Sequence, residues 1–375
     1  MPKLVTNSRV CSTDGGEGGV QRFSAGDQAL SLRRDNTSVI EPCVTSVLDN
    51  WDAVEALYAH AFVDMLKCPT EEYPVLIADA SFSHGVARQR HVELLFEKYN
   101  VPALYLARQA VLAAFSMGRS NAIVVDCGGQ STSVVPVADG FMLEKPSFRS
   151  PVGGDALTAQ LLFSLESSGV PIRPQYEVQR SVAEDGTFSV KYTEFAGTHP
   201  SYAKFAKMRV VEDMKHTVCA VACHSSGASA PEAEAVYELP DGSRVDLGAH
   251  KFSVPELLFD PAPLQVSGAT GLTSMLRDAV MACDPDLRRE LLSNILLVGG
   301  GSLLPNLAQR LTFDITQCIT SSVKVRTVTP GSMERRFAVW IGGSILASLG
   351  SFQQLWISRK EWEEHGSRII PRRCP

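Results

Sequence analysis

The sequence predicts an α/β fold, and three observations support this prediction. Strand-like and helix-like segments alternate between residues 73 and 117, which is typical of layered α/β packing. Three closely spaced apolar segments between residues 123 and 148 predict an antiparallel meander. Two apolar runs, at residues 123–125 and 295–298, each end in a glycine turn. Such turns let backbone N–H groups approach phosphate or ribose, although a glycine turn after a strand is more often only a turn.

Length and composition indicate a globular chain. Its 375 residues, of which 45% are apolar and 20% charged, predict about two or three domains. A net charge of −6 argues against direct, sequence-specific nucleic-acid binding. We expect no membrane contact, because no apolar stretch is long enough to span a bilayer and no signal peptide is visible. The nine cysteines form no disulfide framework, which suits a reducing cytoplasmic or nuclear compartment.

Apolar periodicity assigns the elements in chain order. Residues 1–35 are polar and glycine-rich, and we expect them to be poorly ordered. A hairpin is expected over 236–247, with its turn at Asp241-Gly242, and a capping box at Ser358 and Glu361 begins the final helix. The predicted strands are residues 73–78, 103–106, 123–126, 132–137, 141–148 and 295–298. The predicted helices are residues 51–66, 86–99, 108–117, 155–165, 201–222, 271–282, 287–292, 306–317 and 338–349.

The segment from Glu334 to Ser358 carries a family resemblance. It includes the run Arg336-Phe337-Ala338-Val339-Trp340-Ile341-Gly342-Gly343-Ser344-Ile345-Leu346-Ala347-Ser348-Leu349, which closely resembles the carboxy-terminal signature of the actin family. Shorter matches extend the resemblance over roughly residues 48–375. Segments 115–120 and 150–155 and the ending Arg373-Cys374-Pro375 resemble the nuclear actin-related proteins within that family.

The resemblance implies the actin-like fold shared with Hsp70 and sugar kinases. This α/β fold has two lobes and four subdomains, with ATP in the cleft, and here the N-terminal part of the first domain is reduced or missing. Residues 36–120 and 330–375 would form an incomplete first lobe, with subdomains 1 and 2. Residues 121–329 would form the second lobe, with subdomain 4 at about 155–258.

Site roles are also implied by the resemblance. Asp126, with Gly128 and Gly129, would form the second phosphate hairpin, where Asp126 would orient the water shell of Mg²⁺; its alternative is a plain turn carboxylate. Lys215 and Arg336 occupy basic positions near the adenine and ribose, or are solvated surface charges. The turn expected to pack against adenosine and phosphates consists of Gly299, Gly300, Gly301 and Ser302.

Departures from the actin pattern argue against ATP hydrolysis. No first phosphate hairpin is visible in residues 1–47, since Asp14-Gly15-Gly16 follows no apolar strand, so this part is either natively reduced or missing from the sequence. Gly129 and Gln130 stand where actins carry aspartate and glycine, and Ser133 replaces a histidine that places the attacking water. Gln109 matches the water-orienting glutamine, but phosphoryl transfer needs metal and aligned water together.

The resemblance therefore implies a non-catalytic actin-related subunit of nuclear chromatin-remodelling and histone-acetyltransferase complexes, with some of the protein in the cytoplasm. It would pair with actin or other actin-related proteins on a helical segment of a scaffold subunit, and histones are a further candidate partner. A groove near residues 118–120 and 338–349 would accept the apolar face of that helix. Bound ATP, with Mg²⁺, would be structural. The alternatives are a polymerising cytoskeletal actin-like ATPase and, less favoured, a small-molecule kinase.

Overall fold

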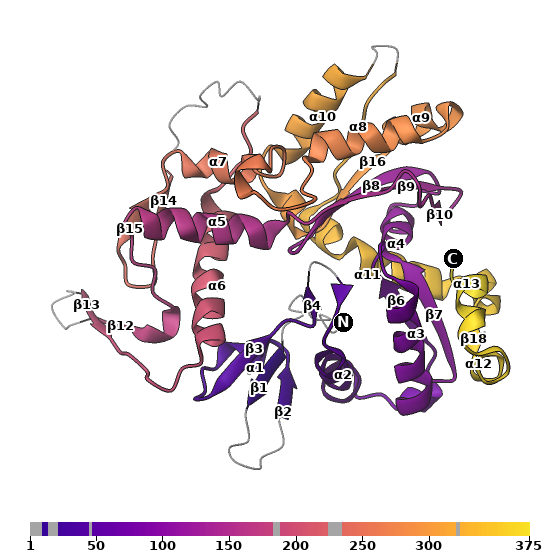
Figure 1. The fold of residues 1–375 in the computed structure, drawn as a ribbon, viewed down its shortest axis with the longest axis horizontal. Coiled ribbons are helices and arrows are strands. Elements are labelled where there is room, and N and C mark those ends of the chain that lie inside the picture. The colour runs from indigo at the N-terminus through magenta and orange to yellow at the C-terminus, as the bar shows by residue number, and fades with distance from the viewer. Residues whose placement is uncertain (1–9, 14–21, 45–46, 183–187, 224–234, 320–322) are drawn as a thin grey trace. The chain divides into compact units, whose positions relative to one another are not determined.

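The structure of the chain is a computed structural model that describes residues 10–13, 22–44, 47–182, 188–223, 235–319 and 323–375 (Figure 1). The glycine-rich residues 14–19 lie outside the described residues. The chain divides into two compact units. Unit 1 comprises Met1–Cys68, Asp155–Ala220 and Ser229–Pro255, and unit 2 comprises Pro69–Gly154, Val221–Ala228 and Glu256–Pro375. The predicted lobe boundaries remain a prediction.

The largest sheet of unit 2 contains the predicted meander. Its strands are β8 (Ala122–Cys127), β9 (Thr132–Ala138), β10 (Phe141–Met142), β11 (Phe148–Ser150), β16 (Ile295–Val298) and β17 (Thr327–Val328), in the order β10-β9-β8-β16-β17, with β11 also paired to β9. One predicted strand, 141–148, is wrong in detail: β10 and β11 are separate strands, and a turn lies between them. β16 runs parallel to β8 and places Val298 opposite Asp126. This long-range pairing brings the two glycine turns to the same sheet edge.

A second sheet of unit 2 has the order β18-β7-β6. Its strands are β6 (Val75–Asp79), β7 (Ala103–Arg108) and β18 (Ile357–Ser358). β6 and β7 are parallel, with Asp79 opposite Arg108. The helices near it include α3 (Gly85–Glu93), which continues as a π-helix over Leu94–Lys98, α4 (Gln109–Ser116) and α11 (Ser332–Ser348).

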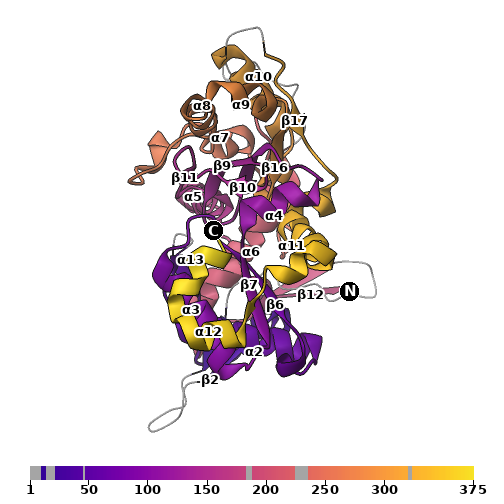
Figure 2. The same cartoon turned by 90° about the vertical axis from the view of Figure 1, so that its right-hand side faces the viewer.

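Helices α4 and α11 pack side by side, as Figure 2 shows. The contact is close at Gly342, where an added Cβ would lie 1.8 Å from the carbonyl oxygen of Leu112. The small residues that the sequence places on α11 therefore allow α4 to approach. The other helices of unit 2 are α8 (Leu272–Ala282), α9 (Pro285–Leu292), α10 (Leu307–Cys318), α12 (Arg359–His365) and α13 (Ile370–Arg373). The predicted capping box at Ser358 and Glu361 is confirmed at the start of α12.

Unit 1 combines helices with small antiparallel sheets. Its helices are α1 (Asp27–Ser31), α2 (Trp51–Ala59, continued by a π-helix over His60–Leu66), α5 (Gly154–Ser167, whose first residue belongs to unit 2), α6 (Pro200–Val218) and α7 (His250–Glu256, whose last residue belongs to unit 2). Its strands are β1 (Val10–Thr13), β2 (Arg22–Ala25), β3 (Thr37–Ile40), β4 (Cys43–Val44), β5 (Val47–Leu48), β12 (Val178–Val182), β13 (Phe188–Tyr192), β14 (Val236–Glu238) and β15 (Arg244–Asp246). The described part of the polar segment 1–35 is thus folded into β1, β2 and α1, which its composition did not predict.

The strands near the N-terminus are held to α6 and the residues before it by hydrogen bonds inside unit 1. The backbone N–H of Asn36 donates to the carbonyl of Gly197 at 2.9 Å, and that of Val39 donates to Ser201 Oγ at 2.9 Å. The Tyr202 hydroxyl donates to the carbonyl of Leu30 at 3.1 Å. β3 also pairs with β1, so these contacts support the strands of the N-terminal segment and explain why its described part is folded. None of the helices that the structure describes is both long and apolar enough to cross a membrane.

Candidate functional site

The candidate site in unit 2 forms where β8 and β16 end. Because the strands are parallel and in register, the turn after Asp126 and the turn that begins at Gly299 lie against each other. Gly299 has a φ of +84°, and an added Cβ would lie 2.4 Å from Asp126 Oδ1 and 2.5 Å from the carbonyl oxygen of Cys127. A Cβ on Gly301 would lie 2.9 Å from the same oxygen. Only glycine fits the interlocked turns.

The turn after β8 is closed by backbone hydrogen bonds. The N–H of Gly128 donates to the carbonyl of Ser131 at 3.0 Å, and the N–H of Gly154 donates to the carbonyl of Gly128 at 2.9 Å. An added Cβ on Gly153 would lie 2.4 Å from the carbonyl oxygen of Gly129. The start of α5 therefore packs directly on this turn, in the kind of arrangement by which backbone groups cradle an anion.

Burial sets the electrostatics of the site. It raises the pKa of Asp126 to about 6, and it raises the pKa of the Cys127 thiol to about 12, with the nearby Asp126 carboxylate as a smaller cause. The Cys127 thiol is therefore protonated at neutral pH and is a poor nucleophile. Of Asp126 and Cys127, only Asp126 would readily lose its proton when a cation binds nearby.

Arg335 supports the second turn from the start of α11. Its Nη1 donates to the carbonyl of Ser302 at 2.7 Å, and its carbonyl accepts the N–H of Gly299 at 3.1 Å. The Ser302 side chain is buried and donates to the Gly299 carbonyl at 2.7 Å. The neighbouring Arg336 is exposed and lies 5.8 Å from the Phe337 ring centroid. The role of Arg335 was not predicted, because the sequence does not show which of the two adjacent arginines faces the turn.

Lys215 belongs to unit 1, on α6. It is buried, and its Nζ donates to Thr158 Oγ1 of α5 at 2.7 Å. Burial lowers its pKa. The sequence left open that Lys215 is a solvated surface charge. This alternative is wrong, because its ammonium group is buried and has a hydroxyl partner.

The arrangement offers few groups for chemistry. The described residues contain no cluster of three or more His, Cys, Asp or Glu side chains that could hold a metal ion directly. A single carboxylate such as Asp126 could hold Mg²⁺ only through water or together with ligand oxygens. Ser133 lies opposite Asp126 on β9, and a serine hydroxyl there is a weaker base than imidazole.

Two parallel strands that end in interlocked glycine turns, beside a buried aspartate, define an α/β protein with a candidate phosphate cradle. A profile of the family described as Actin matches residues 1–375, and the chain belongs to the actin family. The predicted fold class and family are therefore confirmed.

Curated relatives support the predicted subclass. The chain is 41% identical over 371 residues to Actin-related protein 4 of Arabidopsis thaliana, covering 95% of this chain and 84% of the relative. It is 43% identical over 361 residues to Actin-related protein 4 of Oryza sativa subsp. japonica, covering 93% and 82%. A protein of the same name from Yarrowia lipolytica is 34% identical over 362 residues, covering 94% and 83%. The nucleotide roles of Asp126, Gly128, Gly129, Lys215, Gly299, Gly300, Gly301, Ser302 and Arg336 remain predictions.

Proposed function

We propose that this protein is a non-catalytic, actin-related subunit that assembles nuclear chromatin-remodelling and histone-acetyltransferase complexes. In this proposal it pairs with actin, or with another actin-related protein, on a helical segment of a scaffold subunit. Histones are a further contact. The similarity to proteins named Actin-related protein 4 supports the proposal, as does the net charge of −6, which favours action through partners.

One observation carries the proposal: apolar side chains stay exposed along α11 and the turn that follows it. Ile345, Leu349 and Leu355 are 41%, 42% and 42% exposed. Below them Phe352 is buried, with its ring edge-on to Tyr105 at 4.9 Å. The backbone that carries the exposed residues is thus anchored, and a preformed apolar surface suits the apolar face of a partner helix.

Nucleotide has a structural role in this proposal. The glycine turns of unit 2 would hold the phosphates, with Asp126 ordering the water shell of Mg²⁺, and Lys215 and Arg336 would lie on the adenosine side. Bound ATP and Mg²⁺ would stabilise the folded chain by mass action. Gly129 and Ser133, at positions where actins use aspartate and histidine, support the absence of turnover.

The test compares two charge substitutions on exposed apolar residues. The variant Ile345→Asp, Leu349→Asp should lose at least about tenfold in affinity for purified actin with a scaffold helix, because buried carboxylates would replace apolar contacts. Met281→Asp is the matched control, since Met281 on α8 is 58% exposed and lies away from α11. When each protein is captured from nuclear extract, remodeller subunits should co-purify with the wild type but not with the double variant.

Two results would contradict the proposal. Equal binding by the double variant and the Met281→Asp control would exclude the α11 surface. ATP turnover at an actin-like rate, with filaments of this chain alone, would favour the polymerising ATPase.

A further inference from the structure

A groove in unit 1 lies on the face of α6 that points away from the candidate nucleotide residue Lys215. Its floor is a helical stripe of α6, formed by Tyr202, Phe205, Ala206, Arg209, Val210 and Asp213. At about 100° per residue, Lys215 lies on the opposite side of the helix, where it contacts Thr158 of α5. The groove is therefore separate from any adenosine contact that Lys215 makes.

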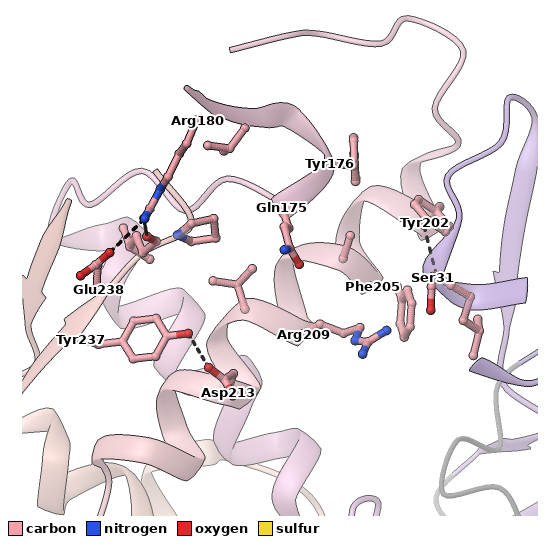
Figure 3. Close-up of a pocket in the computed structure, with 16 residues that line it drawn as sticks. Ser31, Gln175, Tyr176, Arg180, Tyr202, Phe205, Arg209, Asp213, Tyr237 and Glu238 are labelled. Carbon is pink, nitrogen blue, oxygen red and sulfur yellow. Dashed lines mark hydrogen bonds and ion pairs between the residues drawn. The ribbon is translucent and has the colours of Figure 1, made fainter. Parts of the chain in front are cut away.

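Hydrogen bonds tie the walls of the groove together (Figure 3). Arg180 of β12 donates to Glu238 Oε1 at 3.0 Å and to the carbonyl of Leu239 at 2.6 Å, which joins β12 to β14. The Tyr237 hydroxyl donates to Asp213 Oδ2 at 2.6 Å, which joins β14 to α6. The bond from Tyr202 to the Leu30 carbonyl closes the far end.

These tethered walls border an open groove of about 950 Å³. Tyr202, Phe205 and Val210 of the stripe are buried, whereas Arg209 and Asp213 remain exposed, so the groove opens beside a packed aromatic part of the helix. Pockets for small ligands have volumes of roughly 300–1,000 Å³. Because the walls are already fixed by their own hydrogen bonds, a ligand would enter a preorganised site.

The two aromatic residues of the floor join Tyr176 to form an aromatic wall on one side of the groove. The ring of Tyr202 lies 5.9 Å from that of Tyr176 and 6.2 Å from that of Phe205. Tyr202 and Phe205 are largely buried, so their positions are fixed by packing. Such a wall fits a flat or branched apolar group.

Arg209 supplies the charge of the groove. Its natural partner at i+4, Asp213, is turned to the Tyr237 hydroxyl instead, and Arg209 forms no ion pair with any carboxylate in the described part of the chain. Its guanidinium lies 5.9 Å from the Phe205 ring centroid, and Figure 3 shows the side chain extending towards the Phe205 ring. The other lining cation, Arg180, is already paired with Glu238. The fork of Arg209 is thus available to an anion beside the aromatic wall.

We propose that this groove binds an organic anion in which a carboxylate or phosphate group is joined to a flat or branched apolar body. Arg209 binds the anionic group, and Tyr176, Tyr202 and Phe205 contact the apolar body. The same chemistry is found in a free small molecule and in an acidic, aromatic stretch of a partner peptide. The proposal needs no bound nucleotide and no scaffold helix, so it stands apart from the proposed function.

Calorimetry on the full chain, without nucleotide, tests the groove. The probes are 3-phenylpropionate, its neutral amide and phenyl phosphate, with acetyl-Phe-Glu-amide as the peptide arm. Either anion should bind saturably and at least about tenfold more tightly than the neutral amide, because a charge-assisted pair is lost in the amide. The peptide binding more tightly than both free anions would identify a partner segment as the source.

Arg209→Gln should weaken binding of the anionic probes by about tenfold or more and leave binding of the amide unchanged. Lys204→Gln is the matched control, because Lys204 is an exposed cation of α6 that does not line the groove. Both substitutions are at exposed positions, and circular dichroism checks that the variants fold. Equal affinity of wild type and Arg209→Gln for the anions, or no saturable binding of any anionic probe, would overturn the proposal.

Discussion

Unit 2 contains two parallel strand pairs that end in an aspartate, and the two ends differ. At the end of β6, Asp79 lies 3.0 Å from Arg88 Nε and 3.1 Å from Arg108 Nη1. Arg88 also donates to the carbonyl of Cys374 at 2.5 Å, so the C-terminal residues cover this end. At the end of β8, Asp126 faces Gly299 instead of a cation.

The difference separates a structural carboxylate from one suited to a ligand. Burial raises the pKa of Asp79, but the two arginines oppose this shift. Its carboxylate already forms ion pairs inside the protein, so it is not available to a ligand. Burial raises the pKa of Asp126 to about 6, and no cation among the described residues opposes this shift. A strand-end aspartate without a cationic partner, beside glycine turns, keeps its charge available for a bound cation.

The largest effect is expected at the paired end. Arg88→Met should destabilise the protein by about 3–5 kcal/mol, because it leaves Asp79 buried with one cation fewer. Thermal unfolding measures the change. The matched control is Lys207→Met, which removes the exposed pair with Glu166 and should cost about 0–1 kcal/mol. Equal losses for the two variants would show that the Asp79 cluster is no tighter than a surface pair.

A pH series tests the unpaired end. The folded pKa of Asp126, about 6, is above its unfolded value, so its contribution to stability is fully present below about pH 4 and is lost as pH rises through 6. We therefore expect the free energy of unfolding of Asp126→Asn, relative to that of wild type, to rise by up to about 3 kcal/mol as the pH increases from 4 to 7. Nucleotide and divalent cations are left out of this experiment. Urea unfolding at each pH measures the difference. If the difference in free energy of unfolding between the variant and wild type stays constant across this pH range, the charge of Asp126 is already stabilised by its surroundings.

Two adjacent glycines test how closely the turns interlock. Gly299→Ala should cost at least about 2 kcal/mol, since it combines a φ of +84° with a Cβ 2.4 Å from Asp126 Oδ1. Gly300→Ala is the control, because among the described residues nothing beyond its chain neighbours lies within 4 Å of its added Cβ. Thermal unfolding should separate the two variants clearly. Similar stability would mean that the turn can move away from Asp126.

The smallest effect concerns the residues that cover Asp79. Glu361 caps α12 and accepts from Arg373 Nη2 at 2.6 Å, and its pKa is lowered to about 2, chiefly by the Ser358 backbone N–H. Glu361→Gln should cost about 0–1 kcal/mol, because glutamine keeps the capping-box acceptor and only the charged pair with Arg373 is lost. It should also speed the labelling of the buried Cys374 thiol by a small thiol reagent. An unchanged labelling rate would show that the Arg373 pair does not hold the C-terminal residues in place.

The contrast also explains what could be predicted. Local signals were sufficient for the longer helices and for strands β6 to β9 and β14 to β16, because apolar periodicity and turn glycines act over a few residues. The capping box at Ser358 and the helix over α8 are examples. The break between β10 and β11 was not predicted, and the N-terminal strands and the short strands β12, β13, β17 and β18 were missed, because their pairing partners, and not their composition, stabilise them.

The sequence by itself determined the α/β class, the actin family and the glycine turns at Asp126 and Gly299. It could not place Asp126 against Gly299, since the register of β8 and β16 joins segments far apart in the chain. Nor could it show that Arg335 supports the turn while Arg336 is exposed, or that Arg88 and Arg108 both pair with Asp79. Such partners depend on distances through space, which only the tertiary structure decides.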